Sequence, residues 1–172
     1  MVIGTFFSEV GNDLLRDLLS HFRNKEDISL YLNVTGSWTN NDFRKAAKFA
    51  YHLPVDIDHN KLNLDHLKEF FSDKRGFILT LLENPSLLEH DRFTDLLWAV
   101  THVDEELKAR PSLSNLPDKD LNHIAADIQR MYDHLASEWI DYVEHLKTDY
   151  PYLFSLILRT HPFQEHPSPL IS

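Results

Sequence analysis

Cysteine is absent from the 172-residue chain, and glycine occurs only four times. Without cysteine there are no disulfides, no thiolate metal ligands and no cysteine nucleophile. Gly4, Gly11, Gly36 and Gly76 lack the spacing of a phosphate-binding loop or a dinucleotide-binding turn, and no nucleophile elbow is present. The sequence therefore gives no support to these common enzyme classes, and we expect no catalytic residues of these kinds.

Basic residues are too few to balance the acidic ones. The chain has 17 lysines and arginines against 27 aspartates and glutamates, which gives a formal net charge of −10. A protein that binds nucleic acid through its phosphates needs a surplus of basic residues. We therefore expect no nucleic-acid partner and no attraction to an anionic membrane surface.

Long hydrophobic runs are also missing. Every apolar run is shorter than the roughly 18 residues that a membrane-spanning helix needs, and the beginning MVIGTFF lacks the basic and apolar regions of a signal peptide. We expect no insertion into a membrane and a cytoplasmic location. With an apolar fraction of 42%, the chain has enough material for one core, so residues 1–172 are predicted to form a single domain.

Apolar residues recur at steps of three and four over most of the chain, which predicts a mainly α, single-domain helical bundle. Asn40 or Asn41 is expected to cap one helix and Asn63 the next. Within the domain, residues 1–60 hold a helix, a strand and a helix, residues 61–163 form the helical core, and residues 164–172 form a tail. The predicted helices cover about residues 5–23, 40–51, 64–83, 89–109 and 118–163.

The last of these helices carries the clearest pattern. It reads as one long amphipathic helix that runs into the nearly all-apolar segment YPYLFSLILRTHPF. Leu135, Trp139, Tyr142 and Leu146 lie on its apolar stripe. We expect this stripe to be buried against the helices of residues 64–83 and 89–109.

Residues 28–35 are the exception to the helical pattern. Ile28, Leu30, Leu32 and Val34 alternate with polar or half-polar residues, which is the period of a half-buried β-strand. A lone strand needs a hydrogen-bonding partner. The candidates are residues 55–57, the same strand in a second copy of the chain, or no strand at all but an extended arm on the core. The second candidate favours a homo-oligomer, a homodimer in the simplest case.

His134, Glu138, Asp141 and His145 share the polar face of the last helix. Their offsets of 4, 7 and 11 residues place them within roughly 60° on the helix surface. We interpret them mainly as a solvated face and expect no cofactor. The alternative is a divalent transition metal, which would require ligands from another helix. The candidates for those ligands are His102 with Glu105 or Glu106, and His59 with His66.

The chain is also rich in histidine, with eleven in all. Protonation of all of them would bring the formal charge from −10 to about +1 between roughly pH 7 and pH 6. We therefore expect association to increase near pH 5.5, where net repulsion vanishes.

Two segments resemble a known family. ENPSLLEHDRFTDLLWAVTHVDEEL at 83–107 and EWIDYVEHLKTDYPYLFSLILRTHPF at 138–163 are similar to the soluble C-terminal region of prokaryotic proteins described as two-pore-domain-type potassium channels. The resemblance covers residues 64–163 at most, and this chain has neither the selectivity filter nor the pore helices. It implies a cytosolic accessory or assembly module, or a free-standing relative of one.

Two functions from different classes follow. We favour a non-catalytic interaction or assembly module that forms homo-oligomers or docks on an ion-channel-type membrane protein. The alternative is a metal-dependent enzyme or metal-binding helical bundle that uses histidine and carboxylate ligands.

Overall fold

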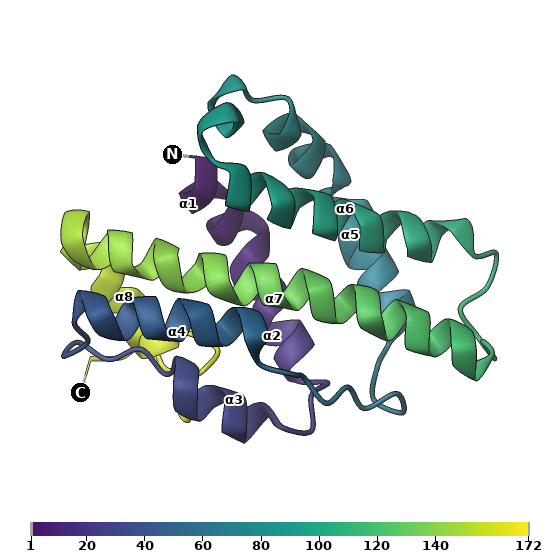
Figure 1. The fold of residues 1–172 in the computed structure, drawn as a ribbon, viewed down its shortest axis with the longest axis horizontal. Coiled ribbons are helices and arrows are strands. Elements are labelled where there is room, and N and C mark those ends of the chain that lie inside the picture. Colours follow the sequence, from purple (N-terminus) through teal and green to yellow (C-terminus); the bar gives the residue numbers. More distant parts are fainter. Residues whose placement is uncertain (1, 172) are drawn as a thin grey trace.

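The computed structural model describes residues 2–171 as helices joined by loops, with no sheet among them (Figure 1). This confirms the mainly α fold class. The elements are α1 (Val2–Phe6), the π-helical turn η1 (Phe7–Gly11), α2 (Asn12–Leu19), α3 (Lys25–Leu32), α4 (Asn40–His52), α5 (Leu64–Leu82), the 3-10 turn η2 (Pro85–Glu89), α6 (Asp91–Ala109), α7 (Asp118–Asp149) and α8 (Pro151–Thr160).

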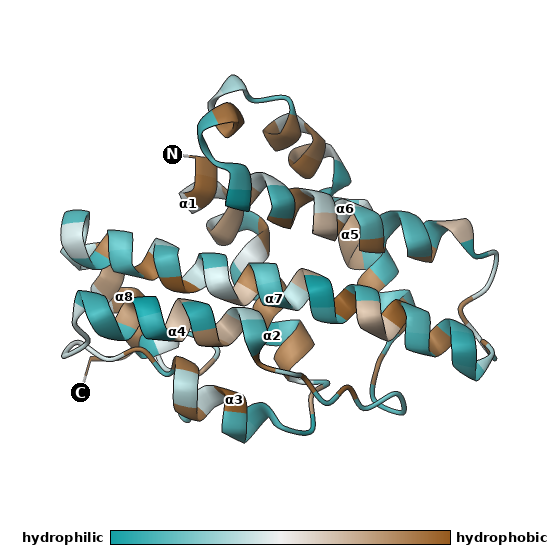
Figure 2. Ribbon diagram, viewed as in Figure 1, coloured by the Kyte–Doolittle hydropathy of each residue, from teal (hydrophilic) through white to brown (hydrophobic). Residues whose placement is uncertain are grey.

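The 32-residue helix α7 is the axis of the fold, and α4 and α6 pack along it (Figure 1). Its apolar stripe is visible in Figure 2 as brown segments between teal ones. Leu135, Trp139 and Leu146 are fully buried, as predicted, whereas Tyr142 is only half-buried and stacks on Phe7. Helix α5 packs mainly on α6, so the 64–83 helix is not a main packing partner of the stripe, whereas the 89–109 helix is.

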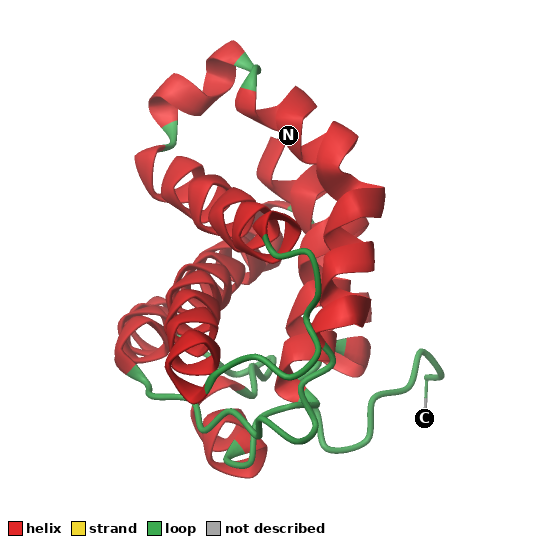
Figure 3. Ribbon diagram, turned by 90° about the vertical axis from the view of Figure 1, so that its right-hand side faces the viewer, coloured by secondary structure: helices red, strands yellow, loops and turns green. Residues whose placement is uncertain are grey.

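The predicted helix over 118–163 is two helices. It breaks at Tyr150 because Pro151 has no backbone N–H to continue the helical ladder and disfavours a helical conformation in the residue before it. Helix α8 then runs back along α7, which brings Phe163 against Trp139, with ring centroids 5.1 Å apart. Residues 164–171 extend from the helices as a loop (Figure 3).

Residues 28–35 do not form a strand, so this part of the fold prediction is wrong. Helix α3 buries Ile28 and Leu32, one helical turn apart, and leaves Leu30 81% exposed. An alternating pattern contains the i, i+4 pair that a helix also buries, so only the middle position separates the two structures. Ile57 instead forms an isolated antiparallel bridge with Phe22. The strand-mediated dimer therefore loses its structural basis.

The helix ends follow local chemistry. Thr39 caps α4 in a capping box with Asp42, in place of the expected Asn40 or Asn41, whereas Asn63 caps α5 as predicted. Within residues 2–171, no helix is long and apolar enough to cross a bilayer.

Candidate functional site

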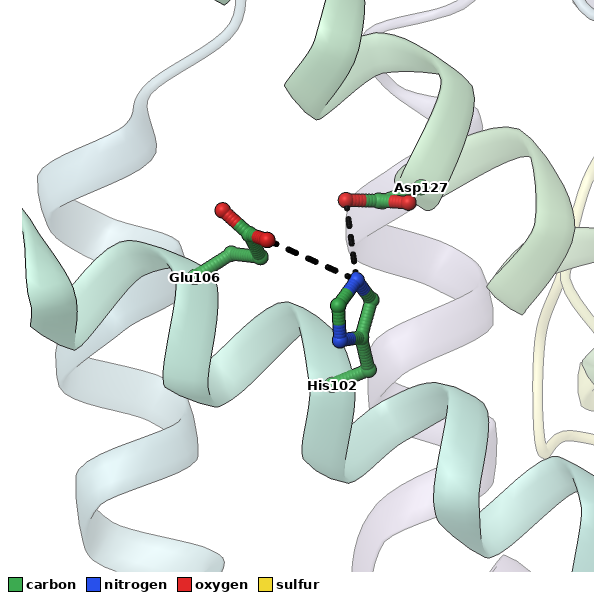
Figure 4. Close-up of side chains that lie close together, drawn as sticks. All are labelled: His102, Glu106 and Asp127. Atoms are coloured by element: carbon green, nitrogen blue, oxygen red, sulfur yellow. Dashed lines mark ion pairs between the residues drawn. The ribbon is translucent and has the colours of Figure 1, made fainter.

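The loop of residues 110–117 folds α7 back against α6 and brings two matching pairs of side chains together. His102 and Glu106 lie one turn apart on α6, and His123 and Asp127 lie one turn apart on α7. Figure 4 shows His102, Glu106 and Asp127 pointing toward one another across the two helices. We call these four residues the α6–α7 cluster.

The nitrogen and oxygen atoms of the cluster converge. His102 Nε2 lies 3.2 Å from Asp127 Oδ2 and 3.6 Å from Glu106 Oε1. His123 Nε2 lies 3.4 Å and 3.3 Å from the same two oxygens. Two ligands of one zinc ion are roughly 3.3–3.5 Å apart, because the bonds are about 2.0–2.2 Å long and the angle between them is nearly tetrahedral. The four separations, 3.2–3.6 Å, are close to the spacing of neighbouring ligands around a single ion.

Among residues 2–171, His102, Glu106 and Asp127 form the one group of three potential ligands whose coordinating atoms all lie within 4.8 Å of one another. His123 adjoins this group from the other side of the two carboxylates. The arrangement supplies a core of three ligands and an adjacent fourth.

An arginine holds the second oxygen of each carboxylate. Arg130 donates to Asp127 Oδ1 at 2.7 Å, and Arg110 donates to Glu106 Oε2 at 2.8 Å. Arg110 is itself fixed by two hydrogen bonds to Asp120, at 2.6 and 2.7 Å. These contacts turn the other oxygen of each carboxylate toward the imidazoles, as outer residues orient the ligands of metal sites. Hydrogen bonds from Arg110 and His123 also hold the pKa of Glu106 below its usual range.

Asp127 is the most buried member of the cluster, with 4% of its surface exposed. No hydrogen bond from residues 2–171 reaches its Oδ2 atom, although both imidazoles lie close to it. A buried carboxylate oxygen without a donor destabilises a fold unless a cation compensates it. His102 and His123 are about half exposed, so the cluster opens to solvent on their side.

Sequence reasoning found half of this cluster. His102 with Glu106 was one of the candidate pairs, whereas Glu105 is exposed and lies outside the group. His123 and Asp127 were missed. Their signal in the sequence is a second His-x-x-x-carboxylate pair on the following helix, at a similar distance from the same loop.

The predicted face of α7 lies elsewhere and does not converge on a point. His145 pairs with Asp149 at 2.9 Å, and the His134 ring lies edge-on to Tyr51. Glu138 is only 7% exposed, so its description as part of a solvated face is wrong. The other candidate pair, His59 with His66, does not form a group of potential metal ligands among residues 2–171. His66 Nε2 instead lies 3.4 Å from Asp17 Oδ1.

Arg92 of α6 organises the middle of that face. Its guanidinium lies 3.3 Å from Glu138 Oε1 and 3.0 Å from Asp141 Oδ2. Burial raises the pKa of Glu138 to about 7, against the lowering effect of Arg92, and also raises the pKa of Asp141. Burial lowers the pKa of His134. This face is therefore partly desolvated and carries a carboxyl group that titrates near neutral pH.

Comparison with known proteins gives a family but no activity. Residues 1–159 match the family described as "Uncharacterized protein MJ1433, C-terminal helical domain". The chain is 42% identical over 163 residues to "Uncharacterized protein MJ1433" of Methanocaldococcus jannaschii, an alignment that covers 95% of this chain and 65% of that protein. No solved structure matches the chain. Neither description mentions an ion channel, so the resemblance to potassium-channel proteins gains no support from them. The chain belongs to the family of the C-terminal helical domain of MJ1433.

Proposed function

We propose that this helical domain binds one divalent transition-metal ion, zinc in the first instance, between α6 and α7. The ligands are His102, Glu106 and Asp127, with His123 as the fourth. The observation that carries the proposal is the buried Asp127 Oδ2, which receives no hydrogen bond from residues 2–171 and lies 3.2 and 3.4 Å from two imidazole nitrogens. Imidazole and carboxylate ligands together suit zinc and related first-row metals.

The ion would act as a cross-link between the two helices. Each helix contributes one histidine and one carboxylate, so bound metal would hold α6 and α7 in register near the loop that joins them. Binding that occurs only in the folded state adds to the stability of the fold. The half-exposed histidines leave one side of the site accessible to solvent.

The competing interpretation is a network of ion pairs in which protonated histidines, rather than a metal, balance Asp127 and Glu106. The two interpretations differ in metal content and in their response to chelators. The protein should therefore be purified without a histidine tag, loaded with zinc, dialysed and analysed for metal. We expect one zinc per chain, and a lower melting temperature after treatment with EDTA.

A matched pair of double variants locates the ion. His102→Gln with His123→Gln should abolish zinc binding, whereas His134→Gln with His145→Gln should keep it and shift the free energy of unfolding by no more than about 1 kcal/mol. Zinc-free wild-type protein after loading would overturn the proposal. So would zinc that survives the first double variant and is lost in the second, which would assign the metal to the α7 face instead.

A second candidate function is the interaction or assembly module, and the surface of α8 favours it. Tyr152 is 72% exposed, and Leu153 and Leu156 are also exposed on this helix. Apolar surface of this kind is typical of contact regions between proteins. A second copy of the chain is the partner we propose, and the mass in solution at pH 8 and pH 5.5 tests it. Docking on an ion-channel-type membrane protein rests on the resemblance of residues 83–107 and 138–163 alone.

A further inference from the structure

A pocket lies between α4, α6 and α7, separate from the α6–α7 cluster. Its volume is about 420 Å³, which is within the range of pockets that hold small molecules. None of its lining residues belongs to the α6–α7 cluster. They are Arg44, Ala47, Lys48, Tyr51 and His52 of α4, Arg92 and Asp95 of α6, and His134, Ser137, Glu138 and Asp141 of α7.

The α4 wall of this pocket is cationic. Arg44, Lys48 and Tyr51 follow one another at steps of four and three residues, so they share one face of the helix. Within residues 2–171, no carboxylate lies close enough to Arg44 or Lys48 to form an ion pair, in contrast to Arg92 across the pocket. Arg44 does attract Glu144 of α7 at longer range, since it counteracts the rise that burial causes in the pKa of that carboxyl. Two cations one turn apart, neither in a direct ion pair, are suited to a doubly charged anion.

The opposite wall accepts hydrogen bonds. Glu138 and Asp141 of α7 line the pocket, and Arg92 holds one oxygen of each. Glu138 is buried, and the neighbouring Ser137 hydroxyl donates to the Ala47 carbonyl at 3.0 Å, which ties this part of α7 to α4. The carboxylate oxygens that Arg92 leaves free can accept hydrogen bonds from hydroxyl groups of a ligand.

From this division of charge, we propose that the α4–α6–α7 pocket binds a small phosphate monoester of a hydroxylated molecule, of the sugar-phosphate class. The phosphate lies at Arg44 and Lys48, the hydroxyl groups donate to Glu138 and Asp141, and the Tyr51 ring forms one side of the pocket. The two positive charges of Arg44 and Lys48 match the charge of about −1.5 to −2 that a phosphate monoester carries at pH 7.

A simple anion site does not fit the pocket as well. The Asp141 carboxylate, and Glu138 in its ionised form, repel an anion that has no donor groups, whereas hydroxyl donors turn the same oxygens into attractive contacts. A polyanionic nucleic acid is disfavoured because the chain as a whole carries a net charge of −10. The ligand must therefore combine an anionic group with donors on a small scaffold.

The full chain should be titrated with ribose 5-phosphate, glucose 6-phosphate and glycerol 3-phosphate, with inorganic phosphate and ribose as comparison probes. Calorimetry and amide chemical shifts are the readouts. We expect at least one monoester to bind with a Kd below about 1 mM, at least about tenfold tighter than inorganic phosphate, with shifts confined to α4, α6 and α7. Ribose alone should not bind in this range.

Variants on one helix provide the control. Lys48→Gln should weaken binding at least about fivefold and Arg44→Gln with Lys48→Gln should abolish it, whereas Lys45→Gln on the same helix, outside the pocket, should leave it unchanged. The proposal is overturned if none of the three monoesters binds, if inorganic phosphate binds as tightly as they do, or if Lys45→Gln weakens binding as much as Lys48→Gln. Folding of each variant is checked by its helical circular dichroism.

Discussion

The imidazole of His161 packs against the indole of Trp139, with ring centroids 5.5 Å apart. The same indole donates from Nε1 to Asn12 Oδ1 at 3.2 Å, at the start of α2. Trp139 therefore joins the N-terminal helices and the C-terminal turn through one fully buried side chain of α7. Elements from both ends of the chain depend on it.

Replacing Trp139 with alanine should lower the free energy of unfolding by about 3–5 kcal/mol, because it leaves a large cavity and an unpaired Asn12 side chain. Trp98→Ala is the matched control, since Trp98 is 58% exposed and its truncation should cost no more than about 0.5 kcal/mol. Urea denaturation of both variants measures the difference. Equal denaturation midpoints for the two variants would contradict a central role of Trp139 in the core.

His161 should make stability depend on pH. Burial lowers the pKa of His161 to about 4, although the Val34 carbonyl at 3.3 Å acts in the opposite direction. Its Nδ1 atom accepts a hydrogen bond from the Phe163 amide, so protonation at that atom breaks the contact. The unfolded chain binds a proton near pH 6.5 and the folded chain only near pH 4, so stability is lost as the pH falls between these values.

Over this interval the wild type should lose up to about 3 kcal/mol relative to His161→Asn, which removes the titrating group. His166→Asn, at an exposed histidine of the tail, should follow the wild type. Urea denaturation at pH 4, 5, 6 and 7 tests this. Parallel curves for the wild type and His161→Asn would contradict it.

Glu138 should make stability depend on pH in the opposite direction. Burial raises its pKa from 4.5 to about 7, so the folded chain keeps a proton that the unfolded chain releases. Stability should therefore fall as the pH rises between these two values, by up to about 3 kcal/mol relative to Glu138→Gln. Glu165→Gln at the exposed tail is the control. An unchanged gap between wild type and Glu138→Gln from pH 4.5 to pH 8 would show that Arg92 keeps Glu138 ionised throughout.

Two glycines should respond to alanine in opposite directions. A Cβ at Gly11 would lie 2.4 Å from Cδ1 of the Phe7 ring, in the buried π-helical turn, so Gly11→Ala should destabilise the fold by about 1–3 kcal/mol. A Cβ at Gly76, in the middle of α5, would have no atom of residues 2–171 within 4 Å apart from its chain neighbours and the backbone of its own helix. Gly76→Ala should therefore raise stability by about 0.5–1 kcal/mol. The melting temperatures of both variants measure these effects. Shifts of the same sign in the two variants would contradict the prediction.

Aspartate substitutions distinguish a helix from a strand at residues 28–35. In helix α3, Leu32→Asp places a charge in the core and should cost at least about 3 kcal/mol, whereas Leu30→Asp at an exposed position should cost no more than about 0.5 kcal/mol. In a strand both residues would share a face, and both changes would cost the same. Denaturation midpoints measure the difference.

Local sequence patterns predicted much of the fold. The period of three and four residues identified α4, α5 and α6 within a few residues of their observed bounds, because each helix must bury one stripe whatever it packs against. Asn63 was predictable as a cap for the same local reason. The pattern gave the wrong structure at residues 28–35, because the strand period and the helix period both predict burial of Ile28 and Leu32. The packing of α3 on α4 leaves Leu30 exposed, and the sequence pattern does not contain that information.

The composition and spacing of this sequence determined a helical chain without cysteine, with short apolar runs and with His–carboxylate pairs on its helices. Only the tertiary structure decided which of those pairs meet. His102 and Asp127 are 25 positions apart, and their 3.2 Å separation follows from the way the 110–117 loop folds α7 onto α6. The burial of Glu138 likewise follows from the packing of α4 and α6 on α7. Periodicity fixes the face of one helix, whereas the packing of helices sets the distances and the solvent access between faces.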